Sequence, residues 1–222
     1  MSSFYTRPNA LPPIVKNLII INALVFLAQI TFGITDKLML YPILPEALLQ
    51  MLEDAGHPYY REGQRFMPYQ IATHMFAHAP GMIFHILFNM FALWMFGRVL
   101  ENVWGPKRFL FFYLTCGVGA AIIHLAIQYY TGSASPALGA SGAVMGIFAA
   151  FAYLFPNTEL FIMFIPFPIK AKWAVLGMAA IDLFGGLGLY SSNTAHFAHL
   201  GGALTGFIMV LIWNKNNKRR FY

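Results

Sequence analysis

The chain has 222 residues, of which 59% are hydrophobic and only 10% carry a charge. A water-soluble domain of this length needs more polar surface, so the composition excludes one and predicts an integral membrane protein with several spans. The formal net charge of +6 does not indicate nucleic-acid binding, because the basic residues are scattered over short loops and one tail.

Six apolar segments lie near or above the roughly 18 residues that a bilayer span requires. The first has basic residues ahead of it but no small-residue cleavage site, so we expect a retained helix and not a signal peptide. We find no internal repeat and no linker between domains, and expect one all-α membrane domain over residues 1–222. The predicted spans cover residues 15–34, 82–100, 108–130, 141–156, 171–188 and 195–213.

The stretch between the first two spans, residues 35–80, is long for a membrane bundle and is called the first loop below. Its segment "LPEALLQMLEDAG" has helical spacing, and "YREGQRFMPYQIATHMFAH" is rich in aromatic residues. This apolar content disfavours a disordered loop. We therefore predict short helices that lie at the membrane interface.

The distribution of basic residues predicts how the chain sits in the membrane. Eleven of the 14 lysines and arginines fall in the segments that an even number of spans places on one side, together with both termini. The positive-inside rule then puts both termini inside and the first loop outside, with the tail "NKNNKRR" as an inner-leaflet anchor. Because the short tails carry no organelle signal, we expect a bacterial inner membrane.

The segment "LGASGAVMGIFAA" places Ser141 between glycines at the outer start of the fourth span. No charged residue or histidine lies within ten residues of it, so a base for this hydroxyl must come from another part of the chain. His199 lies about one turn into the sixth span, which also enters from the outside. We predict that Ser141 is a nucleophile and His199 its general base. No Asp or Glu is evidently placed to orient His199, so the prediction is a dyad.

Small residues allow the fourth and sixth spans to approach closely, because glycines spaced by four let membrane helices meet. These glycines are Gly142, Gly146, Gly202 and Gly206. His196 is an alternative base, but the stripe that follows it, His199 and Ala203, contains no glycine. The sequence therefore favours His199.

Two more polar residues lie in the second span, where "HILFN" puts His85 and Asn89 one helical turn apart on one face. Their depth matches that predicted for Ser141. Ser141 itself opens a helix, whose unsatisfied N–H groups and positive dipole end favour a developing oxyanion. We predict that His85 and Asn89 donate further hydrogen bonds to that oxyanion.

Taken together, these motifs resemble the rhomboid family of intramembrane serine proteases. The resemblance covers nearly the whole chain: six spans, a long first loop, "HILFN", "GASG", "AHLGGALTG", and "GRVLENVWG" after the second span. It implies a Ser141–His199 dyad, and an oxyanion hole of His85, Asn89 and the Ser141 amide beside a turn shaped by Gly139. The implied reaction is cleavage of transmembrane protein substrates near the outer membrane surface, at a small residue in a locally unstable helix. Membrane lipid is the other expected partner, with no cofactor and no nucleic acid.

Two positions depart from the family pattern. Many members carry Trp-Arg in the first loop, where this chain has Tyr69 and Gln70, so a structural role for that pair is left open. Many also have an aromatic residue one turn after the nucleophile, packed on the catalytic histidine, where this chain has Met145. A methionine can also contact an imidazole face, so this change is tolerable.

Several other titratable residues favour structural roles. Asp182 lies inside the fifth span, and a hydrogen bond between helices is favoured over a role in chemistry. His74 and His78 are spaced for a metal, but without HExxH or a suitable carboxylate no metal site is expected. We expect His124 to be a hydrogen-bonded core residue, and Glu101 to cap or pair at the inner surface.

Other functions compete with proteolysis. A rhomboid-like protein that only binds membrane-protein clients would lack the serine or the histidine, and this chain has both Ser141 and His199. A solute transporter calls for interrupted helices in a repeated arrangement, and neither is found. A membrane metalloprotease lacks its ligands. The preferred function is therefore an intramembrane serine endopeptidase, with the client-binding protein as the alternative.

Overall fold

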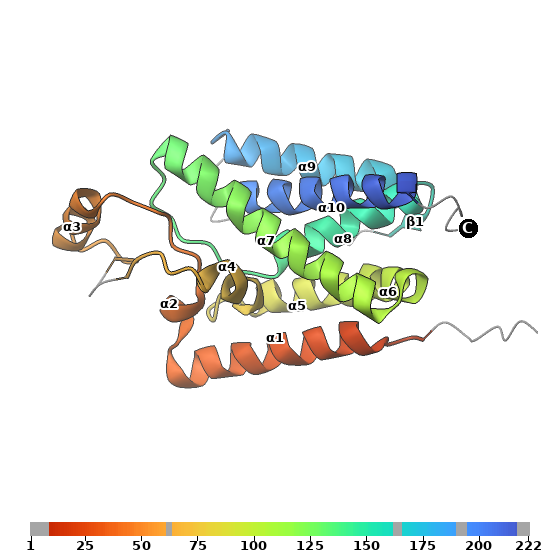
Figure 1. Cartoon of the computed structure of the whole chain (residues 1–222), viewed down its shortest axis with the longest axis horizontal. Helices are drawn as coiled ribbons and strands as arrows, with labels where there is room; N and C mark the ends of the chain where they lie inside the picture. Colours follow the sequence, from red (N-terminus) through yellow and green to blue (C-terminus); the bar gives the residue numbers. More distant parts are fainter. Residues whose placement is uncertain (1–8, 61–63, 162–165, 190–194, 217–222) are drawn as a thin grey trace, which may run out of the picture.

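The computed structural model describes residues 9–60, 64–161, 166–189 and 195–216 of a helical bundle. Most of its long helices run roughly along the long axis of the molecule, and the helix of residues 106–131 crosses them at a slant (Figure 1). A two-residue antiparallel pair of strands lies between α8 and α9 in the chain. α5, η2 and α6 follow one another without a break and form one long helix. The elements are α1 (Pro13–Phe32), α2 (Thr35–Leu38), α3 (Glu46–Asp54), α4 (Gln70–Thr73), η1 (His74–Phe76), α5 (Ile83–Ala92), η2 (Leu93–Gly97), α6 (Arg98–Trp104), α7 (Pro106–Thr131), α8 (Ser141–Leu154), β1 (Glu159–Leu160), β2 (Ile169–Lys170), α9 (Ala171–Gly186) and α10 (His196–Asn216).

Each predicted span coincides with a helix, and the ends agree to within four residues. Among the described residues, four helices are long and apolar enough to cross a membrane: α1, the α5–η2–α6 helix, α7 and α10. α8 and α9 have 14 and 16 residues, fewer than the roughly 20 that a spanning helix needs. The helical membrane fold is thus confirmed, while the count of six spans stays a prediction.

α8 occupies the centre of the bundle and packs chiefly against α10 and α7. Twelve of its 14 residues are buried. Its apolar sequence without polar periodicity fits this position, because a helix that is hydrophobic on all sides is buried on all sides. A helix enclosed by protein in this way needs no contact with either membrane surface, which accounts for its short length.

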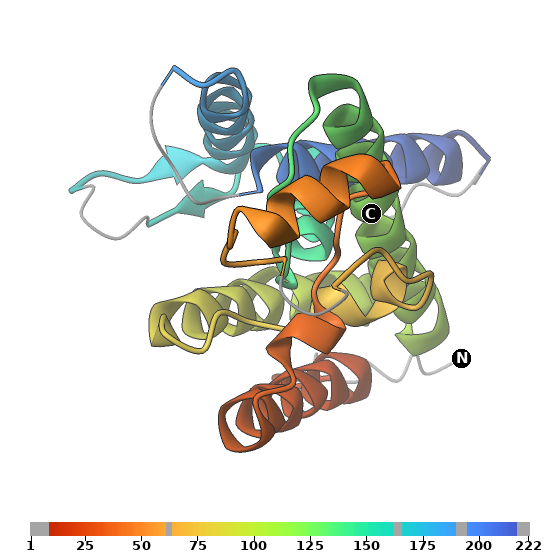
Figure 2. The same cartoon turned by 90° about the vertical axis from the view of Figure 1, so that its left-hand side faces the viewer.

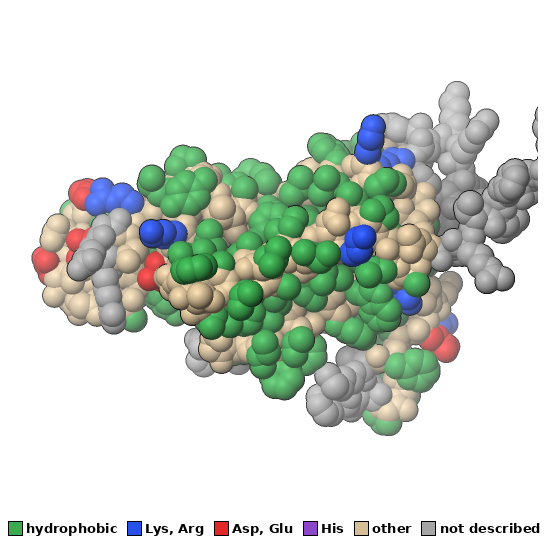
Figure 3. Space-filling view, turned by 90° about the horizontal axis from the view of Figure 1, so that it is seen from below, with side chains coloured by type: hydrophobic (Ala, Val, Ile, Leu, Met, Phe, Trp, Pro, Cys, Tyr) green, Lys and Arg blue, Asp and Glu red, His purple; other side chains and the backbone are tan. Residues whose placement is uncertain are grey.

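Large hydrophobic side chains cover the outer faces of the bundle. Leu24 on α1, Phe84 on α5 and Leu176 on α9 are each more than half exposed, at 60%, 61% and 57%. Figure 3 shows one such face, with hydrophobic side chains over its middle and charged side chains toward its two ends. An apolar belt of this kind is unfavourable in water and matches the hydrocarbon core of a bilayer.

The first loop folds into short helices with a small core of their own, as the sequence predicted. Met39, Tyr41, Leu49 and Tyr60 pack together there. The Tyr60 hydroxyl donates a hydrogen bond of 2.6 Å to the carbonyl of Ala134, which ties this core to the loop before α8. Figure 2 shows α3 in front of one end of the bundle, so the first loop covers that end.

The opposite end holds the start of α1 and the end of α10 (Figure 1). Glu101, near the end of α6, caps α1 there. Its two carboxylate oxygens accept hydrogen bonds from the backbone N–H groups of Ile14 (2.9 Å) and Val15 (2.8 Å). These N–H groups have no partner within the helix, so the carboxylate satisfies them and complements the helix dipole. The predicted capping role of Glu101 is confirmed.

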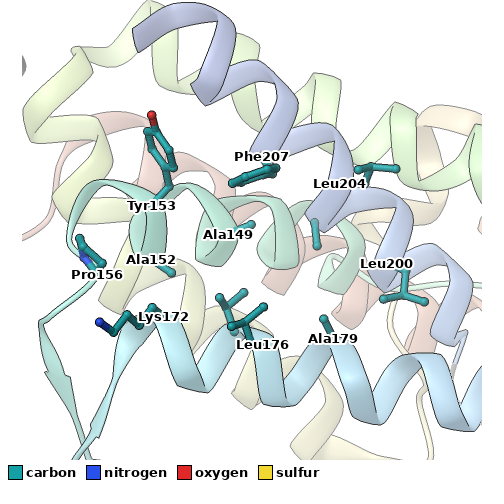
Figure 4. A pocket seen from close by; sticks show the side chains of 12 residues that line it. Ala149, Ala152, Tyr153, Pro156, Lys172, Leu176, Ala179, Leu200, Leu204 and Phe207 are labelled. Carbon is teal, nitrogen blue, oxygen red and sulfur yellow. The ribbon is translucent and has the colours of Figure 1, made fainter. Parts of the chain in front are cut away.

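An apolar groove of about 510 Å³ separates α9 from the α8–α10 pair over part of its length. Figure 4 shows it, with Ala149 and Ala152 of α8, Leu176 of α9, and Leu204 and Phe207 of α10 among the side chains that line it. α9 therefore packs less closely on its neighbours than they pack on each other.

Candidate active site

Ser141 and His199 meet between α8 and α10, although 58 residues separate them in the chain. Ser141 is the first residue of α8, and His199 lies in the first turn of α10. The Ser141 Oγ lies 2.7 Å from the His199 Nε2, which is a short hydrogen bond. Of the two histidines that competed in the sequence, the structure places His199 next to the serine.

Backbone contact between α8 and α10 holds this pair together. A Cβ atom added at Gly202 would overlap the carbonyl oxygen of Gly142. A Cβ atom at Gly206 would lie 2.5 Å from the carbonyl oxygen of Gly146, which real Cβ atoms do not approach so closely. The four glycines predicted from spacing therefore lie in one interface. The two helix backbones can touch there because glycine has no side chain beyond a hydrogen atom.

Asp182 on α9 completes a chain of hydrogen bonds behind His199. Its Oδ1 lies 3.0 Å from the Nδ1 of His199 and 2.8 Å from the Nδ1 of His196. The prediction that no carboxylate is placed to orient His199 is wrong. The prediction of a hydrogen bond from Asp182 to another helix is confirmed.

His85 presents a defined ring nitrogen to the site. The backbone N–H of Ala79 donates a 3.2 Å hydrogen bond to the His85 Nδ1. In a neutral imidazole the other nitrogen then carries the proton, so Nε2 is the donor. A Cβ atom at Gly139 would lie 3.0 Å from this Nε2 and 3.3 Å from the Ser141 Oγ. The His85 N–H and the Ser141 hydroxyl therefore flank the same backbone position.

Asn89 lies one turn further along α5 and is buried, with 7% of its surface exposed. Its Nδ2 donates a 2.7 Å hydrogen bond to the carbonyl of His85 within the same helix. An amide nitrogen has two hydrogens, so this bond fixes the side chain and leaves one hydrogen for another acceptor.

The turn before Ser141 needs glycine and is held by the first loop. Gly139 has φ of +130°, a conformation that residues with a side chain rarely adopt. Its N–H donates a 2.9 Å hydrogen bond to the carbonyl of His74. Leu40 and Ala137 exchange two backbone hydrogen bonds nearby, of 2.8 and 2.9 Å. The first loop thus positions the backbone that leads into the serine.

His78 in the first loop is joined to α1 by polar side chains inside the bundle. Its Nε2 lies 2.9 Å from the Asn22 Oδ1, and its backbone N–H and carbonyl pair with the amide of Gln29, both at 2.9 Å. Burial, together with the neighbouring His85, lowers the pKa of His78 to about 3. Sequence reasoning missed Asn22 and Gln29, although two amides seven residues apart in an apolar helix were a usable signal.

His74 and Gln70 brace the first loop. The His74 Nδ1 lies 3.0 Å from the carbonyl of Gln70, and burial lowers the pKa of His74 to about 4. The Gln70 Oε1 accepts hydrogen bonds from the backbone N–H groups of Tyr41 (3.2 Å) and Met67 (3.1 Å). Gln70 therefore organises the loop at one of the positions that depart from the family pattern. Within the described ranges, no three His, Cys, Asp or Glu residues come together as metal ligands.

His124 on α7 lines a polar pocket of about 300 Å³ beside His196. The pocket also contains Gln128 and, from the first loop, Tyr59. His124 is buried, yet neither of its ring nitrogens has a hydrogen-bond partner among the described residues. The prediction that it is a core residue is confirmed by its burial, while its predicted hydrogen bonds are not made to any described residue. Such a pocket has the polar groups and the volume to hold water near the site.

Comparison with known proteins identifies the fold family. The rhomboid domain matches residues 65–216, which is more than half of the chain and includes every candidate site residue. The chain belongs to the rhomboid family. This rhomboid is 37% identical over 137 residues to the human "Presenilin-associated rhomboid-like protein, mitochondrial", a match that covers 59% of this chain and 36% of the relative. It therefore spans about a third of the length of that protein.

Two further relatives come from a yeast and a bacterium. "Rhomboid protein 1, mitochondrial" of Saccharomyces cerevisiae is 32% identical over 126 residues, covering 56% of this rhomboid and 36% of the relative. "Rhomboid protease GluP" of Bacillus subtilis is 33% identical over 126 residues, covering 56% and 22%. The expectation of a bacterial inner membrane is wrong, because several relatives carry mitochondrial names. Short tails were a poor guide to location.

Proposed function

We propose that this rhomboid is an intramembrane serine endopeptidase that cleaves transmembrane-anchored protein substrates near the membrane surface at the Ser141 end of α8. The proposal rests on one observation above all. Ser141 and His199 form a 2.7 Å hydrogen bond between two helices whose contacting backbones hold them in place. The name of the Bacillus relative, a rhomboid protease, supports the same activity.

The proposed reaction begins when the Ser141 Oγ attacks a peptide carbonyl of the substrate while the His199 Nε2 takes its proton. The oxyanion that forms is bound by the N–H of Ser141, the Nε2–H of His85 and the amide of Asn89. The protonated His199 then gives its proton to the leaving amine. A water molecule, activated by the same histidine, hydrolyses the acyl-enzyme and restores Ser141.

The proposed substrates are membrane proteins with a locally unstable transmembrane helix and a small residue at the cleaved bond. An intact helix hides its peptide bonds, because each carbonyl accepts a hydrogen bond within the helix. A segment that unwinds at the level of Ser141 exposes a carbonyl to attack. Since several relatives are named as mitochondrial, we further propose that the chain works in a mitochondrial membrane.

The alternative is a rhomboid that binds membrane-protein clients without cutting them. The short Ser141–His199 contact disfavours it, because binding alone has no use for a serine hydroxyl held against an imidazole nitrogen.

The deciding experiment measures cleavage of a transmembrane model substrate by the purified protein in liposomes, together with labelling by a fluorophosphonate probe. Ser141→Ala is expected to abolish both, with a melting temperature close to that of the unchanged protein. Ser133→Ala, a serine in the loop before α8, is the matched control and should keep both activities. Cleavage of the same bond by Ser141→Ala would rule out the proposed nucleophile.

The same assay tests the oxyanion donor. His85→Ala should slow cleavage by about 10²- to 10³-fold, the usual loss when one preorganised donor is removed. The loss should be partial, because the Ser141 amide and Asn89 still bind the oxyanion. An unchanged rate would leave His85 with only its structural hydrogen bond to Ala79.

A further inference from the structure

Gln29, near the end of α1, binds the backbone of one first-loop residue through both ends of its amide. The side chain is buried, with 2% of its surface exposed. Its Oε1 accepts a 2.9 Å hydrogen bond from the N–H of His78, and its Nε2 donates one of 2.9 Å to the His78 carbonyl. The Nε2 also donates to the Thr35 Oγ1, at 3.1 Å. Both amide hydrogens and the amide oxygen are thus in use, which fixes the orientation of Gln29.

The His78 carbonyl that Gln29 binds belongs to the same peptide group as the Ala79 N–H. That N–H donates the 3.2 Å hydrogen bond to the Nδ1 of His85. A peptide group is planar, and in the trans form its C=O and N–H point in opposite directions. The orientation that turns the carbonyl toward Gln29 therefore turns the N–H toward the ring of His85. We infer that Gln29 is a positioning residue for the oxyanion hole, because it holds the peptide group that decides which nitrogen of His85 carries the proton.

The backbone around this peptide group needs such a clamp. Residues 77–79 lie outside any helix or strand, so no regular hydrogen-bond ladder orients them. Pro80 restricts the backbone of Ala79, but the rotation of the peptide group also depends on the ψ angle of His78. Gln29 fixes that angle, because it binds the N–H and the C=O of His78 at the same time.

The direction of the Ala79 N–H has a chemical consequence. An N–H group only donates, so it binds a ring nitrogen without a proton, and the Nε2 of a neutral His85 is then the donor. If the N–H turns away, the ring can adopt the other tautomer, whose Nε2 offers the oxyanion no hydrogen. A carbonyl that accepts a hydrogen bond also makes the N–H of its peptide group a stronger donor. Loss of Gln29 should therefore weaken oxyanion binding, although Gln29 itself donates only to Thr35 and His78.

Asn22 provides a matched control for a purely structural role. It is another fully buried amide of α1, and its Oδ1 lies 2.9 Å from the Nε2 of His78. Asn22 thus holds the ring of His78, whereas Gln29 holds its backbone. If the first loop only needs to be fastened to α1, loss of either amide should matter in the same way. If Gln29 acts through the peptide group, only its loss should alter His85.

The first test determines the protonation of His85 by NMR of protein labelled at the histidine ring nitrogens, in detergent micelles. The signals of His85 are those that disappear in His85→Ala. In the unchanged protein and in Asn22→Leu, the proton should lie on Nε2. In Gln29→Met, which keeps the length of the side chain without the amide, a measurable fraction should carry it on Nδ1. An unaltered tautomer in Gln29→Met would overturn the inference.

The second test measures kcat and KM with a transmembrane model substrate in liposomes. Gln29→Met should lower kcat about tenfold or more, but no further than His85→Ala, with little change in KM because the oxyanion forms only along the reaction. Asn22→Leu should keep kcat within about threefold, even where its melting temperature falls as far. In a His85→Ala background, Gln29→Met should cause no further loss, because it acts through His85. Equal losses with and without His85 would leave Gln29 as a structural residue.

Gln29→Glu is a variant that restores the clamp. Burial favours the neutral form of a carboxyl group, which offers an oxygen to the His78 N–H and an O–H to the His78 carbonyl. At about pH 6, Gln29→Glu should retain several times the kcat of Gln29→Met, and equal rates would contradict the inference.

The inference rests on the proposed function, but the two fail differently. An unchanged protein that does not cleave refutes the function, while the NMR comparison still shows whether Gln29 sets the tautomer of His85. Cleavage unaffected by Gln29→Met refutes only the role of Gln29.

Discussion

The two sides of α10 hold the site by different means. Toward α8, glycines let backbone touch backbone, and a Cβ at Gly202 would overlap the carbonyl oxygen of Gly142. Toward α9, an apolar groove of about 510 Å³ intervenes, and Asp182 reaches both histidines of α10 through side-chain hydrogen bonds. The distance between serine and histidine is thus set by close backbone contact, whereas α9 is joined to α10 by side-chain hydrogen bonds beside a groove. Changes toward α8 should therefore cost more stability than changes toward α9.

The largest effect is expected at the contact between α8 and α10. Gly202→Ala must push the two helices apart, since nothing flexible lies beside the added methyl group. We expect a loss of at least about 3 kcal/mol in the free energy of unfolding, beyond the usual range for overpacked cores, and loss of probe labelling. The melting temperature and the labelled fraction measure both effects.

Gly177→Ala on α9 is the matched control, because a Cβ at Gly177 meets no other atom within 4 Å. Removing a glycine from a helix interior should stabilise the protein slightly, by about 0.5–1 kcal/mol. Equal destabilisation by both changes would show that α9 is packed as tightly as α8.

A somewhat smaller effect on the free energy of unfolding is expected when a large side chain of α8 or of α9 is truncated. Ile147 of α8 is fully buried, while Leu176 of α9 borders the groove and is 57% exposed. Ile147→Ala should cost about 2–5 kcal/mol, because it removes buried contacts and leaves a cavity. Leu176→Ala should cost well under about 1 kcal/mol, since its side chain meets lipid as readily as protein. Denaturation of both variants in the same detergent measures the two losses in the free energy of unfolding. Similar losses would contradict the difference in packing between α8 and α9.

The smallest effect is the pH dependence of stability, which arises from buried histidines of the first loop. Burial lowers the pKa of His74 to about 4, and burial together with His85 lowers that of His78 to about 3. The unfolded chain binds protons at these residues below about pH 6.5, whereas the folded protein does not, so stability is present above that pH and falls as the pH drops. Between pH 7 and pH 5 the loss is about 2 kcal/mol for each histidine.

Melting temperatures of the unchanged protein and of His78→Gln between pH 7 and pH 5 measure this dependence. His78→Gln should be less stable at pH 7, because the hydrogen bond to Asn22 is disturbed, but should lose less on acidification. The same slope in both proteins would remove His78 as a source of the pH dependence.

Much of the site could be predicted from local pattern. Ser141 follows a glycine turn and opens an apolar helix, and His199 shares a helix face with glycines. The spacing of residues within each helix is therefore enough to single out both residues as candidates. The helix positions followed from apolar length in the same way. For His124 the apolar segment predicted its burial, whereas a hydrogen-bond partner depends on other parts of the fold, and no described residue supplies one.

The sequence by itself determined that this rhomboid is a bundle of apolar helices with Ser141 and His199 at helix starts, because hydrophobic length and glycine spacing act within one helix. Only the tertiary structure decided that Asp182 meets His199 and that the Ala79 amide sets the donor nitrogen of His85. The reason is physical. In a membrane, the faces of α9 that meet lipid and those that meet protein are equally apolar, so its pattern does not specify its rotation, which is set by contacts with α10.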